Sequence, residues 1–134
     1  MRIARELFED IVAHAREEAP AECCGLVASS DGVAAKVLRA RNATDRKLRH
    51  LRFEIDPNEV LRFDKQIEQD GLDLGAIYHS HTRTEPKPSQ TDIAFAKNWP
   101  GVLWIIVGLG GDEAHVRTWR IDDGKVSDAE LVVE

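Results

Sequence analysis

The sequence predicts an α/β fold in which helices flank a mixed central β-sheet. Two segments carry apolar residues at helical spacing, and continuous apolar runs typical of buried strands separate and follow them. The order helix, strands, helix, strand, short helix, strands is typical of a mixed sheet with helices packed against it. With 134 residues, the chain is long enough for one domain, 1–134, with its own core.

The first elements are a helix and a hairpin. Apolar residues spaced three and four apart between charged residues predict an amphipathic helix over 3–18. Two short apolar runs, 22–30 and 33–40, lie on either side of Asp31-Gly32. Because this dipeptide readily supplies the positive φ of a tight turn, the two runs predict a β-hairpin.

A loop, a short strand and a second helix follow the hairpin. Residues 41–50 are polar and basic without a period and predict a loop, whereas 51–55 predict a short strand. Asp56 can then cap a helix, Pro57 suits its first position, and Glu59 completes the pattern of a capping box. The N-terminus of this helix is therefore the clearest boundary in the sequence.

The second half alternates strands with one short helix. Prolines mark the loop, a capping serine marks the helix, and an unbroken apolar run marks a central strand. The predicted elements are a strand over 72–81, a loop over 82–88, a short helix over 89–98, a central strand over 102–109, and a hairpin of 114–121 with 126–133.

Charge and composition exclude several classes of function. The 18 basic and 24 acidic residues give a net charge of −6 and are interspersed, so we expect no nucleic-acid partner. No apolar run is long enough to span a membrane, and the acidic N-terminus does not resemble a signal peptide. The adjacent Cys23 and Cys24 are expected to be free thiols. We therefore expect a cytoplasmic protein without a membrane association.

Two histidines and a carboxylate form a candidate metal site. His79 and His81 lie two apart at the end of a predicted strand, so both imidazoles face the same side. Asp92, on the next short helix, could supply a third ligand. Two histidines and one carboxylate leave a fourth position open on zinc, which is typical of a catalytic site. The same three ligands also suit a non-haem iron centre.

The spacing of five residues resembles a known signature. Glu22 lies upstream, followed by His79-x-His81, seven residues, Ser89, two residues and Asp92. This pattern resembles the JAMM (MPN+) metalloprotease motif, and the resemblance extends over nearly the whole chain. It implies the JAMM/MPN fold, which is similar to that of cytidine deaminases.

The resemblance also implies a role for each residue. His79, His81 and Asp92 would bind one zinc ion. Glu22 would take a proton from the zinc-bound water and donate it to the leaving amine, and Ser89 would donate a hydrogen bond to the oxyanion. Taken without the motif, Ser89 is equally a helix cap and Glu22 an acid at the end of a strand. The resemblance therefore predicts a zinc metallopeptidase.

One position favours a particular branch of that family. Thr82 follows the second histidine, where deubiquitinating members usually have proline. The chain is more similar to small prokaryotic Mec-type peptidases, which implies hydrolysis after the C-terminal Gly-Gly of a ubiquitin-like sulfur-carrier protein, with release of cysteine in cysteine biosynthesis. The alternatives are an isopeptidase acting on protein–lysine conjugates, as desampylases and deubiquitinases are, and a non-catalytic scaffold of the same fold. A homodimer is left open.

Two surfaces are candidates for binding the carrier. A diglycine tail has no side chains and could pair with an exposed sheet edge, for which 51–55 and 74–78 are the candidates. The basic stretch 41–52 could dock an acidic face of the carrier. Both are hypotheses from the pattern of the sequence.

Overall fold

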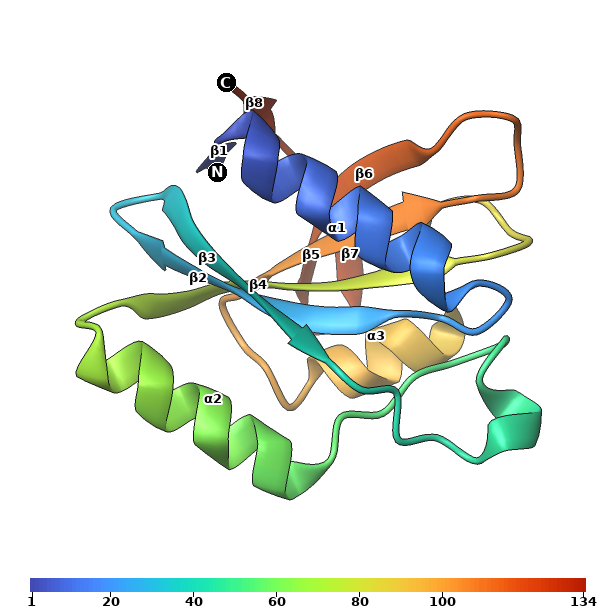
Figure 1. The fold of residues 1–134 in the computed structure, drawn as a ribbon, viewed down its shortest axis with the longest axis horizontal. Helices are drawn as coiled ribbons and strands as arrows, with labels where there is room; N and C mark the ends of the chain where they lie inside the picture. The colour runs from blue at the N-terminus through green and yellow to red at the C-terminus, as the bar shows by residue number, and fades with distance from the viewer.

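The computed structural model describes all residues, 1–134, and contains one eight-stranded sheet with helices on both faces (Figure 1). None of its helices combines the length and the apolar character needed to cross a membrane. The elements are β1 (Arg2–Ile3), α1 (Arg5–Glu18), β2 (Cys24–Ser30), β3 (Val33–Ala40), the 3-10 helix η1 (Arg46–Leu48), α2 (Pro57–Gln69), β4 (Asp73–His81), α3 (Gln90–Ala96), β5 (Leu103–Gly108), β6 (His115–Asp122), β7 (Lys125–Ala129) and β8 (Val132–Val133).

The sheet is mixed, as the order of the predicted elements indicated. Its strands run in the order β7-β6-β5-β4-β2-β3-β1-β8. The β2–β3, β2–β4, β5–β6 and β6–β7 pairs are antiparallel, whereas β4–β5, β1–β3 and β1–β8 are parallel. Because β4 and β5 are parallel, the chain must cross over between them, and α3 lies in that crossover. The crossover places α3 beside the end of β4.

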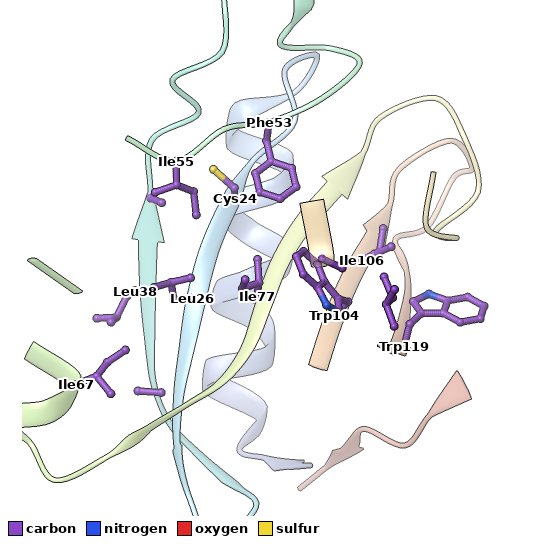
Figure 2. Packing of buried hydrophobic residues seen from close by; sticks show 14 residues of the cluster. Cys24, Leu26, Leu38, Phe53, Ile55, Ile67, Ile77, Trp104, Ile106 and Trp119 are labelled. Atoms are coloured by element: carbon purple, nitrogen blue, oxygen red, sulfur yellow. The ribbon is translucent and has the colours of Figure 1, made fainter. Parts of the chain in front are cut away.

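Each face of the sheet has its own core. Figure 2 shows the larger cluster, which lies on the face covered by α2 and α3 and includes Leu26, Ile77 and Trp104. The second cluster lies under α1 and includes Val27 and Tyr78. Because successive side chains of a strand point to opposite faces, β4 sends Ile77 to one core and Tyr78 to the other. His79 and His81 consequently belong to the face of α2 and α3.

The predicted start of α2 is confirmed, but its cap differs in detail. Asp56 accepts a hydrogen bond from the backbone N–H of Asn58 at 2.8 Å, and Pro57 is the first helical residue. Glu59 does not complete a capping box. Its Oε1 instead accepts a hydrogen bond from the backbone N–H of Arg41 at 2.8 Å, which ties the end of the hairpin to the helix.

The predicted strand over 51–55 is wrong. The alternation that suggested it is real, because Phe53 and Ile55 are both buried in the larger core. The backbone between them has no strand partner. In this segment, the Arg52 carbonyl and the Glu54 N–H pair with the side chain of Asn42, and the Glu54 carbonyl accepts from the Ala43 N–H. The predicted loop before it also contains the 3-10 helix η1.

Neither predicted sheet edge exists. Residues 51–55 are outside the sheet, and β4 lies in its interior between β2 and β5. Tyr78 is fully buried and is hydrogen-bonded to His14 at 2.7 Å, so it does not offer a surface for a peptide tail. The C-terminal hairpin is confirmed for β6 and β7, but 126–133 is not one strand. The chain leaves β7 after Ala129, and β8 pairs with β1.

Gly25 is expected to be the position in β2 that is least tolerant of a side chain. A Cβ there would overlap the ring of Tyr78, which cannot move because it is buried and bonded to His14. Gly25→Ala should lower the free energy of unfolding by about 1–3 kcal/mol, measured by urea denaturation. Gly111→Ala is the matched control, since the nearest atom to its added Cβ is 3.9 Å away. Equal stability of the two variants would contradict this packing.

Candidate metal centre

Three side-chain atoms converge at the C-terminal end of β4. The Nε2 atoms of His79 and His81 are 3.2 Å apart. Oδ2 of Asp92, from the first turn of α3, lies 3.2 Å from the first nitrogen and 3.1 Å from the second. In a tetrahedral zinc site, bonds of about 2.0–2.1 Å separate neighbouring ligand atoms by about 3.3 Å. The three atoms therefore have the spacing that holds one zinc ion.

Contacts around the two imidazoles fix their orientation. His81 donates from Nδ1 to the backbone carbonyl of Glu85 at 2.8 Å, which leaves Nε2 for a metal. The ring of His79 packs against Phe53, with centroids 4.6 Å apart, and its edge faces Trp104. Phe53 and Trp104 lie in the layer drawn in Figure 2. The sequence-based interpretation missed Phe53 as a neighbour of the site, because an alternating apolar residue only predicts burial.

The three atoms His79 Nε2, His81 Nε2 and Asp92 Oδ2 form a candidate metal triangle. Asp92 belongs both to this triangle and to a helix cap. The Ser89 N–H donates to its Oδ2 at 2.9 Å, and its own N–H donates to Ser89 Oγ at 3.1 Å, which completes a capping box. Burial alone would raise the pKa of Asp92, but the adjacent histidines and the Ser89 N–H hold it well below its usual range. Asp92 is therefore a carboxylate at every physiological pH, as a metal ligand must be.

The same contacts raise the pKa of His81 above its ordinary value. Burial acts to lower it, but the hydrogen bond to Asp92 and the Glu85 carbonyl outweigh that effect. The cluster thus attracts positive charge. A divalent cation bound by the three atoms would supply the positive charge that this cluster favours.

Glu22 approaches this triangle from a segment outside the sheet. It lies two residues before β2, so its predicted place on the first strand is wrong. Its side chain is 4% exposed, and Oε1 has no hydrogen-bond partner. One carboxyl oxygen lies within 4.8 Å of a ring nitrogen of both His79 and His81. A buried carboxyl oxygen without a partner requires a further polar group, such as a water molecule or a bound ion.

Burial sets the protonation of Glu22. It raises the pKa of this carboxyl to about 8, with a smaller lowering by His81 and a smaller raising by Asp92. A bound cation would lower the value again. The group is consequently suited to both accept and donate a proton near neutral pH.

The cysteines have no part in this chemistry. Both are free thiols, as expected, and both are buried. They face opposite cores, Cys24 the larger and Cys23 the smaller. Burial raises the pKa of the Cys23 thiol to about 12, so it is neither a nucleophile nor a ligand at neutral pH.

Two histidines of β4, the paired carboxylate of Asp92 on α3 and the unpaired carboxyl group of Glu22 meet at one end of the sheet, and this set of groups suits a metallopeptidase. The chain belongs to the family of prokaryotic homologs of the JAB domain, whose model matches residues 4–122. The resemblance to JAMM proteins is thereby confirmed, and the chain is a JAMM-type metallopeptidase with a candidate zinc site.

Curated relatives cover most of the chain. The desampylase of Pyrococcus furiosus is 33% identical over 114 residues, which make up 84% of this chain and 76% of the relative. The CysO-cysteine peptidase of Mycobacterium tuberculosis is 31% identical over 137 aligned positions, covering 94% of this chain and 86% of the relative. Both are similar to this chain along nearly its whole length.

Solved structures agree on the fold. Protein DSY2949 from Desulfitobacterium hafniense superimposes with a TM-score of 0.86 at 26% identity, covering 100% of this chain and 93% of that one. AF2198, a JAB1/MPN domain protein from Archaeoglobus fulgidus, has a TM-score of 0.64 at 23% identity, covering 98% and 99%. The predicted JAMM/MPN fold is confirmed.

We expect zinc affinity to distinguish the three proposed zinc ligands from Glu22. Asp92→Asn keeps the size of the side chain but removes its charge, so zinc affinity should fall by about 10- to 100-fold or more, measured by competition with a chromophoric chelator. Glu22→Gln should bind zinc like the wild type. If Glu22→Gln lost zinc as readily as Asp92→Asn, Glu22 would be a ligand.

Glu22 should also make the chelator-treated protein less stable as pH rises. Between its ordinary value of 4.5 and about 8, the folded state keeps a proton on Glu22 that the unfolded state releases. The free energy of unfolding then decreases as pH increases across this window. In thermal denaturation with EDTA, stability should decrease less steeply with rising pH for Glu22→Gln than for the wild type. The exposed control Glu113→Gln should have the same pH dependence as the wild type.

Proposed function

We propose that this chain hydrolyses the amide bond after the C-terminal Gly-Gly of a ubiquitin-like sulfur-carrier protein and releases cysteine, using one zinc ion. The observation that carries this proposal is the buried, unpaired carboxyl group of Glu22 beside the triangle of His79, His81 and Asp92. Similarity to a CysO-cysteine peptidase over 94% of the chain supports the choice of substrate.

Each step of amide hydrolysis has a residue in this arrangement. Zinc held by His79, His81 and Asp92 would supply Lewis acidity toward water and the carbonyl oxygen. Glu22 accepts a proton from the attacking water as the new carbon–oxygen bond forms. It returns this proton to the amine nitrogen as the carbon–nitrogen bond breaks, so the amine leaves neutral. One carboxyl group can perform both transfers because the first transfer leaves it protonated and the second returns it to the carboxylate.

Ser89 can serve as a helix cap and as a donor at the same time. Its Oγ accepts the Asp92 N–H with a lone pair, while the hydroxyl hydrogen takes no part in the cap. That hydrogen is free to donate to the oxyanion that forms on the substrate carbonyl. Capping α3 therefore does not by itself exclude donation from Ser89 to the oxyanion.

The basic segment beside the site is the proposed docking face. None of its cations forms an ion pair with a carboxylate in the chain, although the chain as a whole carries a net charge of −6. The segment is continuous with the site, because the Arg49 carbonyl accepts the Glu22 N–H. An acidic face of the carrier would be attracted here. The cations are Arg41, Arg46, Lys47, Arg49 and Arg52.

A second candidate is cleavage of protein–lysine conjugates. The desampylase of Pyrococcus furiosus is as similar to this chain as the CysO-cysteine peptidase is. The chemistry at the carbonyl carbon is identical for both substrates. Only the leaving amine differs, being the α-amine of cysteine in one and the side-chain amine of a lysine in the other.

One carrier bearing either adduct separates the two functions. The zinc-loaded protein should remove cysteine from a carrier that ends in Gly-Gly-Cys faster than it releases the same carrier from a lysine side chain. Both reactions are followed by mass spectrometry of the intact carrier. Glu22→Gln should lower turnover by about 10²- to 10⁴-fold while retaining zinc. The control Glu113→Gln should have wild-type turnover. Faster cleavage of the lysine adduct would favour the second candidate, and full activity of Glu22→Gln would disprove the mechanism.

A further inference from the structure

The side chain of Asn42 uses its complete hydrogen-bonding capacity beside the site. Its Nδ2 donates to the carbonyls of Glu22 and Arg52, both at 3.0 Å. Its Oδ1 accepts from the backbone N–H groups of Thr44, at 3.1 Å, and Glu54, at 3.3 Å. An amide side chain offers two donor hydrogens and two acceptor lone pairs, so none is left over. A half-buried asparagine thus joins three separate stretches of backbone.

The backbone of Glu22 is held from both sides although it lies in no helix or strand. On one side, its N–H donates to the Arg49 carbonyl at 2.6 Å and its carbonyl accepts from Asn42. On the other, the next residue pairs with Ser80, since the Cys23 N–H donates to Ser80 Oγ at 2.8 Å and the Ser80 N–H donates to the Cys23 carbonyl at 3.2 Å. Ser80 lies between the two histidines in β4. These hydrogen bonds therefore fix the backbone next to Glu22 relative to the strand that carries the histidines.

The same amide also locates the ring that packs on His79. Asn42 binds the carbonyl of Arg52 and the N–H of Glu54, which are the residues on either side of Phe53. Phe53 in turn lies against the imidazole of His79. One side chain therefore contacts the backbone on which both Glu22 and Phe53 depend.

We propose that Asn42 is a positioning residue that sets the distance between the Glu22 carboxyl and the metal triangle. The proposal rests on the proposed function, in which Glu22 transfers the proton. Because Glu22 Oε1 has no hydrogen-bond partner, its location depends on the backbone that carries it. A displacement of about 1 Å in a reacting group can reduce the rate about 100-fold.

Asn42→Asp tests this with little change in size. The carboxylate keeps the acceptors for Thr44 and Glu54 but sets a negative oxygen against the carbonyls of Glu22 and Arg52. We expect kcat to fall by about 10- to 100-fold, with KM changed by less than about threefold and zinc content unchanged. Asn58→Asp makes the same chemical change on α2, where the side chain has no hydrogen bond, and should leave kcat and KM at wild-type values.

A double-mutant cycle checks that Asn42 acts through Glu22. Glu22→Asp withdraws the carboxyl by one methylene, so combining it with Asn42→Asp should reduce kcat by less than the product of the separate effects. Fully multiplicative effects would overturn the proposal, as would a change in KM alone or a wild-type kcat in Asn42→Asp.

Other outcomes are assigned as follows. Asn42→Ser removes hydrogen bonds of the Asn42 side chain without adding charge. It replaces Asn42→Asp in the test if Asn42→Asp does not fold, as judged by its thermal transition. If neither variant folded, Asn42 would have a purely structural role and the proposal would be wrong. A wild-type protein that binds zinc but cleaves neither carrier adduct would instead count against the proposed function.

Discussion

Two imidazoles and two carboxyl groups lie almost without solvent at one end of the sheet, and the surrounding structure is arranged to hold them there. Burying ionisable groups is costly unless they are paired. Asp92 is paired with both histidines and with a backbone N–H, whereas Glu22 Oε1 is left unpaired. This inequality gives two chemically similar carboxyl groups different roles, because one remains charged and the other can exchange a proton.

The sheet supplies the rigid part of this arrangement. β4 lies in its interior, so the two histidines project from a strand that has neighbouring strands on both sides. The parallel step from β4 to β5 brings the N-terminus of α3, with Asp92, back to the end of the same strand. Glu22 is the exception, because hydrogen bonds from outside any regular element hold it.

Local patterns predicted the part of the site that lies on regular elements. The alternation of β4 placed His79 and His81 on one face, and the serine–aspartate spacing predicted the cap of α3. The position of Glu22 outside β2 could not be predicted, because contacts between a side chain and distant backbone leave no periodic signal. The wrong strand at 51–55 has the same cause. Phe53 and Ile55 alternate as in a strand, but the side chain of Asn42 and the Ala43 N–H bond to this backbone in place of a neighbouring strand.

Asp92 contributes one oxygen to two structures, since Oδ2 both faces the histidines and accepts the N–H that begins α3. A zinc ion bound at this oxygen would act on the same atom that caps α3, which links occupation of the site to the first turn of this helix. In a helix of seven residues, the first turn is a large part of the whole. Binding of a metal ion would thus act directly on the helix in the crossover between β4 and β5.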